Sequence, residues 1–161
     1  MNRRLVIKPV HLNDIDRQII RNLLEDASKS KAEIARSVGL TPNAVFERLR
    51  KLDERRVIQG YAVRLDPQAL GSKLLAFVFV AESKPVRTVK TGPRLAQLPN
   101  IEEVHRVAGR DCFLLKVRAA DTDELTRILD EIGEIESVSA VETTIVLETF
   151  LEKRFDGGLG P

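Results

Sequence analysis

The sequence predicts an α+β fold in two parts, a helical N-terminal part and a C-terminal part built around a β-sheet. Apolar residues recur with helical periodicity as far as residue 56. Beyond Val57 the pattern changes to short apolar runs and alternating segments that are typical of strands. The later elements follow the order strand-helix-strand-strand-helix-strand of the ferredoxin-like βαββαβ unit. We therefore expect domains at 1–56 and 74–152, a hinge strand and linker at 57–73, and a mobile tail at 153–161.

Three helices are predicted in the first domain from their end signals. Asn13 can cap a first helix, because an Asn side chain accepts hydrogen bonds from the unpaired N–H groups of the first turn. Ser30 and Glu33 have the spacing of a capping box, which opens a second helix that Gly39 ends. Thr41-Pro42 is typical of a cap followed by the first helical residue, so a third helix is expected from there to about residue 55.

The second domain is predicted to combine strands with two helices. Continuous or alternating apolar residues indicate the strands, and apolar residues three or four positions apart indicate the helices. Gly92-Pro93 interrupts the first of these helices. The predicted strands are 58–65 in the hinge, then 74–81, 101–107, 112–118 and 141–150, and the predicted helices are 86–98 and 122–132.

The composition is that of a globular protein without a membrane segment. Apolar residues make up 43% and charged residues 31% of the chain, and no run approaches the roughly 18 apolar residues that a membrane span needs. The N-terminus starts basic but lacks the apolar stretch of a signal peptide. The single cysteine, Cys112, cannot form an internal disulfide. We therefore expect a cytoplasmic protein with no membrane partner.

The net charge of +2 conceals an uneven distribution. Residues 1–60 hold 13 Lys and Arg against 8 Asp and Glu, a net charge of +5, whereas residues 61–161 hold 13 against 16, a net charge of −3. A basic head on a mildly acidic body is typical of a protein that binds a polyanion such as nucleic acid. An excess of this size also arises by chance, so charge alone leaves both interpretations open.

The second and third helices, joined by a turn at Gly39, have the arrangement of a helix-turn-helix, in which the second helix of the pair enters the major groove of DNA. At about 100° per residue, Val45, Leu49 and Leu52 form the buried stripe of the third helix. The side chains on the opposite side project outward, and they are Asn43, Glu47, Arg50 and Lys51.

These outward side chains have the chemistry of base recognition, since Asn pairs with adenine, Arg with guanine, and Glu accepts from cytosine. Arg48 lies beside the buried stripe, where it can reach a phosphate or pair locally. A solvated helix face accounts for the same charges, and Glu47 with Lys51 can be a plain i,i+4 pair. Under the recognition hypothesis, the residues predicted to contact DNA are Thr41, Asn43, Ala44, Glu47, Arg48, Arg50 and Lys51.

A series of short segments covers nearly the whole chain, from about residue 12 to residue 150. They are Leu12–Ile20, Glu33–Pro42, Arg48–Leu52, Val57–Tyr61, Leu65–Pro67, Val107–Gly109, Phe113–Val117 and Thr143–Leu147. No single segment is decisive, but their order and spacing together are highly specific. In this respect the chain resembles the leucine-responsive regulatory protein/asparagine regulator (Lrp/AsnC) family.

The resemblance implies a winged or simple helix-turn-helix, a hinge strand, and a C-terminal domain through which such proteins dimerise and often assemble into octamers. Family members bind amino acids or related metabolites between dimers, and they repress or activate transcription. A dimer presents two recognition helices to successive major grooves, so the expected partner is double-stranded DNA with a roughly palindromic site. The resemblance further implies an amino-acid effector and no other cofactor.

The turn between the second and third strands of the C-terminal domain lies near the effector pocket of the family. The implied effector-binding residues are Gly109, Arg110, Asp111, Cys112 and Thr143. Gly109 is in the first place a turn glycine, and Arg110 with Asp111 can either orient an amino acid or form exposed turn charges. Cys112 stands where the family commonly has Asp, and Val141 stands where it often has Thr. The identity of the effector therefore stays open.

Two alternatives compete with a DNA-binding regulator. A sirohaem-decarboxylase-like enzyme on the same scaffold would need a strand rich in His, Tyr and Arg, but only His105 and Arg106 lie there and Tyr61 is in the hinge. No paired acid and base can be assembled, so no catalytic residue is expected. His11 and His105 with one cysteine have no metal-ligand spacing. The second alternative, a metabolite-binding module without DNA specificity, disagrees with the basic first third of the chain.

Overall fold

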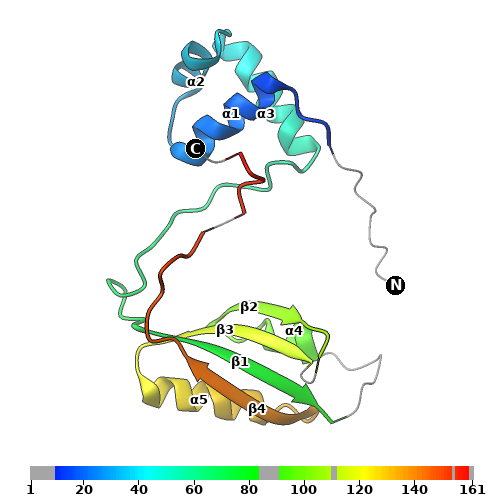
Figure 1. Ribbon diagram of the computed structural model, residues 1–161, viewed down its shortest axis with the longest axis vertical. Coiled ribbons are helices and arrows are strands. Elements are labelled where there is room, and N and C mark those ends of the chain that lie inside the picture. The colour runs from blue at the N-terminus through cyan, green and yellow to red at the C-terminus, as the bar shows by residue number, and fades with distance from the viewer. Residues whose placement is uncertain (1–9, 84–90, 110–111, 154, 160–161) are drawn as a thin grey trace. The chain divides into compact units, whose positions relative to one another are not determined.

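The computed structural model describes residues 10–83, 91–109, 112–153 and 155–159, and it separates into two compact units. The first unit comprises the described residues up to Val63 together with those from Lys153 onward, and the second unit is Arg64–Glu152. Figure 1 shows that one unit is helical and that the other is a sheet with helices. The predicted fold class is therefore confirmed. Among the described residues, no helix has the length and apolar character to cross a membrane.

The helical unit contains α1 (Asp14–Glu25), α2 (Lys31–Val38) and α3 (Pro42–Glu54). Each start signal acts as predicted. The Asn13 side chain accepts a hydrogen bond from a first-turn N–H of α1 at 2.8 Å, and Ser30 and Glu33 form both halves of the capping box of α2. Thr41 caps α3 in the same way. These caps satisfy N–H groups that a helix leaves unpaired, so they fix where the helices begin.

The helical unit has its own apolar core. Ile19 of α1, Ile34 and Ala35 of α2, and Val45 and Leu49 of α3 are all buried and form one cluster. Full burial of side chains of this size contributes roughly 1.5–3 kcal/mol each. The cluster fixes the rotation of α3 about its axis, because only one stripe of that helix can enter it.

The hinge strand predicted at 58–65 is not formed, and the structure corrects this prediction. The segment has no regular secondary structure, and Tyr61, Val63 and Leu65 are exposed. Alternating apolar residues favour an extended backbone, but a strand also needs a neighbour that pairs with its N–H and C=O groups. Among the described residues of this single chain, no other strand pairs with the segment.

The second unit is a four-stranded antiparallel sheet with the order β2-β3-β1-β4. Helix α4 (Thr91–Leu95) lies between β1 and β2 in the chain, and α5 (Thr122–Gly133) lies between β3 and β4. This order is the predicted ferredoxin-like βαββαβ topology. The strands are β1 (Leu74–Glu82), β2 (Ile101–Arg106), β3 (Phe113–Ala119) and β4 (Val138–Ile145).

The two faces of the sheet differ in what they carry. Ala76, Val78 and Val80 of β1 are fully buried in one cluster with apolar residues of α4 and α5, so both helices cover this face. Because side chains alternate along a strand, Phe77 and Phe79 point to the other face. They are half-buried there. We call this second surface the open face.

An ionic network lies on the open face beside these two phenylalanines. Lys116 and Arg118 of β3 are its cations, and the Lys116 ammonium lies 3.2 Å from Glu102 and also contacts Glu152. Arg118 donates from Nε to Glu102 at 2.6 Å and pairs with Glu152 at 3.4 Å. Lys116 is buried although it is charged, with an exposure of only 9%. Because Glu152 lies beyond β4, the network attaches the segment that follows the last strand to the sheet.

Two predicted elements differ from their observed bounds by more than one residue at an end. Of the helix predicted at 86–98, the structure shows Thr91–Leu95, while residues 84–90 lie outside the described part. Pro93 does not break this helix, because it lies in the first turn, where its missing N–H leaves no helical bond unmade. The last strand ends at Ile145 instead of 150: Ile145 pairs with Ala76 of β1, and one further hydrogen bond, from the Val146 N–H to the Leu75 carbonyl at 2.9 Å, follows this pair.

The described part of the tail is folded back instead of extended. The Asp156 carboxylate accepts from the Gly158 N–H at 2.9 Å and pairs with Lys153 at 2.7 Å. These hydrogen bonds hold the pKa of Asp156 below its ordinary value, the Lys153 bond having the larger effect. Leu159 is buried at 7% exposure.

Candidate nucleic-acid interface

The turn between α2 and α3 is built on Gly39, as the helix-turn-helix prediction requires. Gly39 has a φ of +68°, a left-handed conformation that L side chains rarely adopt. The N–H of Leu40 donates to the carbonyl of Ala35 at 2.9 Å, which closes the end of α2. This turn lets α3 start two residues later and pack directly against α2.

The exposed and buried sides of α3 are those that the angular sorting predicts. Val45, Leu49 and Leu52 are the buried residues of this helix. Thr41 lies at its N-cap, and its hydroxyl accepts from the Ala44 N–H at 3.2 Å. The four side chains predicted to project outward are exposed or half-exposed, namely Asn43, Glu47, Arg50 and Lys51.

Arg50 lies between two carboxylates of its own helix. One guanidinium nitrogen is 2.9 Å from Glu47, and another is 2.5 Å from Glu54. The hydrogen bond to Glu47 is the main reason that the pKa of Arg50 lies above its ordinary value. About half of each side chain is exposed to water. Such surface pairs contribute little to stability, so Arg50 can exchange its partners at low cost.

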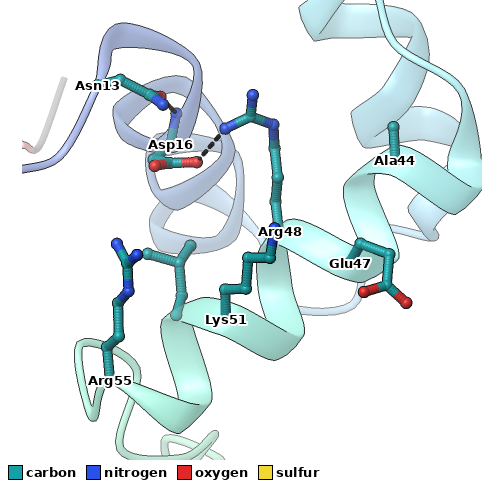
Figure 2. Close-up of a pocket in the computed structure, with 8 residues that line it drawn as sticks. Asn13, Asp16, Ala44, Glu47, Arg48, Lys51 and Arg55 are labelled. Carbon is teal, nitrogen blue, oxygen red and sulfur yellow. Dashed lines mark hydrogen bonds and ion pairs between the residues drawn. The ribbon is translucent and has the colours of Figure 1, made fainter.

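Arg48 pairs across helices instead of along one. Its Nη1 donates to Asp16 of α1 at 2.7 Å, and both side chains are partly buried. Figure 2 shows the Arg48 guanidinium directed toward α1 and away from the side on which Glu47 projects. Arg48 therefore has a partner within the protein, but this partner lies on another helix, 32 residues away in the sequence. Four of its five N–H donors remain for other acceptors.

A cavity of about 380 Å³ lies between the start of α1 and one side of α3, from Ala44 to Arg55 just beyond the helix. Figure 2 shows Lys51 and Arg55 on the α3 side of this space and Asn13 with Asp16 on the α1 side. Among the described residues, neither Lys51 nor Arg55 forms an ion pair. Cations without carboxylate partners leave the cavity able to accept an anionic group. The lining residues are Asn13, Asp16, Ala44, Glu47, Arg48, Lys51, Leu52 and Arg55.

Four of these lining residues are outside the set predicted to contact DNA: Leu52, which belongs to the buried stripe of α3, and the polar residues Asn13, Asp16 and Arg55. In the sequence, Asn13 and Asp16 carry only the signals of a helix start, and these roles account for them fully. The separation of 32 residues between Asp16 and Arg48 offers no periodic signal. Arg55 lies one residue beyond α3, but a continuation of the helical angle by one residue places it beside Lys51 and Arg48.

The predicted effector residues lie in the sheet unit. Gly109 has a φ of +158°, and the Cys112 N–H donates to the Val80 carbonyl at 2.9 Å, so Cys112 flanks β1. Thr143 of β4 pairs with Val78 of β1, on the edge of β1 that faces away from β3. Thr143 is half-buried, and Val78 is buried. Arg110 and Asp111 lie outside the described residues. The structure therefore describes three of the five predicted effector residues, and their role stays a prediction.

Family models match both parts of the chain. An AsnC-type helix-turn-helix domain matches residues 12–53, and an Lrp/AsnC ligand binding domain matches residues 75–154. The HTH-type transcriptional regulator FL11 of Pyrococcus horikoshii is 37% identical over 143 residues, with 89% of this chain and 94% of the relative covered. The HTH-type transcriptional regulator LrpA of Mycobacterium tuberculosis is 36% identical, with 89% and 95% covered.

A solved structure supports the same relationship. The feast or famine regulatory protein of M. tuberculosis, complexed with L-methionine, has a TM-score of 0.83 and 35% identity, with 90% of this chain and 98% of that chain covered. These relatives are named as regulators, which gives no support to the sirohaem-decarboxylase alternative. The resemblance predicted from the sequence is confirmed, and the chain belongs to the Lrp/AsnC family of HTH-type transcriptional regulators.

Proposed function

We propose that this regulator recognises DNA through the outward face of α3 and fixes its position with the cations around the cavity. Asn43, Glu47, Arg50 and Lys51 face outward together, and this common face is the observation that carries the proposal. Their side chains can donate to and accept from base edges in the major groove. Thr41 and Ala44 bring the N-terminal end of the helix to the same groove.

The second part of this proposal concerns the phosphates. Arg48 is held by Asp16, so its remaining donors can reach a phosphate from a fixed position. Lys51 and Arg55 line the cavity without carboxylate partners among the described residues. A phosphate at the mouth of the cavity would neutralise these cations and release counterions.

The test is a comparison of Arg50→Ala with Arg55→Ala. Duplexes selected from a random pool by the wild-type protein serve as specific DNA, and random duplexes serve as non-specific DNA. Arg50→Ala should lower affinity for the selected duplex by about 1–3 kcal/mol and relax preference at one base position. Arg55→Ala should weaken both kinds of DNA alike and reduce the salt dependence by about one counterion. An equal loss on both DNAs for Arg50→Ala contradicts its role in base recognition.

We further propose that the protein is a homodimer that buries the open face, and that two recognition helices then meet a roughly palindromic site. Phe77 and Phe79 place large apolar rings on this face, opposite the face that the helices cover. Apolar side chains on a sheet face that no helix covers, here partly exposed, are typical of association surfaces. The unpaired segment with Val63 and Leu65 offers a second copy a strand to pair with. Assembly of dimers into an octamer is part of the same proposal.

Sedimentation of a charged variant tests the dimer. Phe79→Asp should shift the protein toward monomer, because a second copy would have to bury the new carboxylate. Arg127→Asp, on the exposed side of α5, is the matched control and should sediment as the wild type. Identical sedimentation of both variants contradicts the open face as the interface.

An amino acid is the effector that the relatives favour, since one relative was solved with L-methionine. We propose that Gly109, Cys112 and Thr143, with Arg110 and Asp111, form its site, and that the protein acts in the cytoplasm as a regulator without catalysis. A thermal-shift screen of amino acids and their oxo-acids tests this, because a ligand that binds only the folded protein raises its apparent stability. If Cys112→Asp and Thr143→Ala leave the thermal shift by the bound amino acid unchanged, the predicted site is wrong.

A further inference from the structure

Phe46 is a large aromatic residue on the surface of α3. It is not among the side chains of this helix to which a DNA contact is assigned above. Its exposure is 42%, although its neighbour Val45 is fully buried. Phe46 is also absent from the apolar cluster that holds the three helices together. The ring therefore lies beside the outward face of α3, in the second turn from its N-terminus, where recognition helices contact bases.

Lys31 holds the ring of Phe46 in place. The ammonium nitrogen lies 4.6 Å from the ring centroid, within the range of a cation–π interaction. Lys31 is the first residue of α2, the helix that crosses the DNA backbone in a helix-turn-helix. The cation thus covers one side of the ring. The exposed part of the ring is left for a different, apolar contact.

Among the groups that bases present in the major groove, the 5-methyl of thymine is the apolar one, and Phe is among the side chains that contact it. We propose that Phe46 contacts the methyl group of a thymine in each half-site and that Lys31 positions the ring for this contact. The proposal rests on recognition of DNA by α3. It adds an apolar determinant to the polar ones, and it assigns an A·T pair to the flank of α3 away from the cavity.

Replacement of thymine by deoxyuridine tests the proposal, because only the methyl group is removed. In duplexes selected by the wild-type protein, each thymine is replaced singly, and affinity is measured by fluorescence anisotropy at one salt concentration. Loss of one buried methyl should weaken wild-type binding about fourfold at one thymine per half-site. Phe46→Ala and Phe46→Gln should bind both duplexes equally.

Three further variants separate base contact from a structural role. Leu24→Ala removes an apolar side chain of similar exposure from α1, and it should keep the wild-type ratio between thymine and uracil. Lys31→Gln should lower that ratio, and Lys31→Arg should restore it, because Arg also forms cation–π interactions. Thermal melting by circular dichroism checks that each variant is folded. If Phe46→Ala does not fold, the inference is tested by the thymine-to-uracil replacements with the wild-type protein and with Phe46→Gln.

Three outcomes overturn the inference. In the first, wild-type affinity is the same whichever thymine is replaced by uracil. In the second, the Phe46 variants retain the wild-type ratio of affinities for thymine and uracil duplexes. In the third, Lys31→Gln has the same ratio as the wild type. A failure of the wild-type protein to select any sequence from the pool contradicts DNA recognition by α3 itself. The two failures are therefore distinguishable in one experiment.

Discussion

The ion pairs of Arg50 on α3 and the ionic network of β3 differ in how far water reaches their cations. On α3, Arg50 lies between Glu47 and Glu54, and the three side chains are 46–56% exposed. Each pair joins residues three or four positions apart on one helix, so it forms and breaks without moving the backbone. These pairs lie on the surface that we assign to DNA.

In the sheet unit, the side chains of Lys116 and Arg118 are only 11% and 17% exposed, and carboxylates from separate segments surround them. Removal of a partner there leaves charges that water reaches poorly, which is costly. The difference shows where each unit tolerates change. The ion pairs of α3 are exchangeable and suit a surface that binds and releases DNA, whereas the network of β3 fixes the sheet and the segment after β4.

Lys116→Met should produce the largest effect. It removes one of the two cations shared by Glu102 and Glu152 and the Lys116 charge near Glu103, and we expect the free energy of unfolding to fall by about 2 kcal/mol. This is less than the full cost of a broken buried pair, because the carboxylates are partly exposed. Urea unfolding followed by circular dichroism measures the loss. Lys73→Met, at an exposed lysine, should change stability by less than about 0.5 kcal/mol, and equal losses would remove the distinction.

The Arg48–Asp16 pair lies between the two extremes and tests the comparison within the helical unit. Asp16→Ala should lower the free energy of unfolding by about 1 kcal/mol, because the pair joins two helices and is partly buried. Asp14→Ala is the control, since Asp14 lies in the same first turn of α1 and shares the helix-dipole effect. Equal losses in urea unfolding show that the contact with Arg48 adds nothing.

Local signals explain which features of the fold are predictable from the sequence. The caps at Asn13 and Thr41 and the capping box of Ser30 and Glu33 each depend on residues within a few positions of one another. The apolar periodicities similarly place the buried stripe of α3. Gly39 is predictable because its left-handed backbone restricts the choice of residue. These features need no knowledge of the rest of the chain.

Partners distant in the sequence explain what is not predictable. The pattern at 58–65 indicates an extended backbone but not whether a strand is available to pair with it. The partner of Arg48 is 32 residues away. Even the local pairing on α3 differs from the i,i+4 alternative of Glu47 with Lys51, since Glu47 pairs with Arg50 instead. Spacing permits both pairs, and the side-chain positions of the folded helix decide between them.

Glu54→Gln should have a small effect on stability and a clear one on DNA binding. Loss of one exposed pair should change the free energy of unfolding by less than about 0.5 kcal/mol. Arg50 then keeps a single carboxylate partner, and we expect about two- to fivefold tighter binding to the selected duplex. Asp53→Asn is the control, because it removes a neighbouring carboxylate that does not pair with Arg50. If both variants bind equally tightly, general charge is the cause and not the release of Arg50.

The smallest effect concerns Glu33, whose interactions are entirely exposed. The Ser30 hydroxyl, followed by the Ser30 N–H, donates to the Glu33 carboxylate and holds its pKa below the ordinary value of 4.5. In the window just below that value, the unfolded chain therefore binds more protons at this position than the folded chain does. The stabilisation is complete above the ordinary pKa and is lost as the pH falls through the folded pKa.

The matching experiment follows the midpoint of urea unfolding from about pH 5 to about pH 3. Glu33→Gln should show a weaker decline than the wild type, because Gln retains the capping box but does not titrate. Glu25→Gln, which leaves the capping box intact, should decline as the wild type does. An unchanged decline in Glu33→Gln shows that the cap carries no pH dependence.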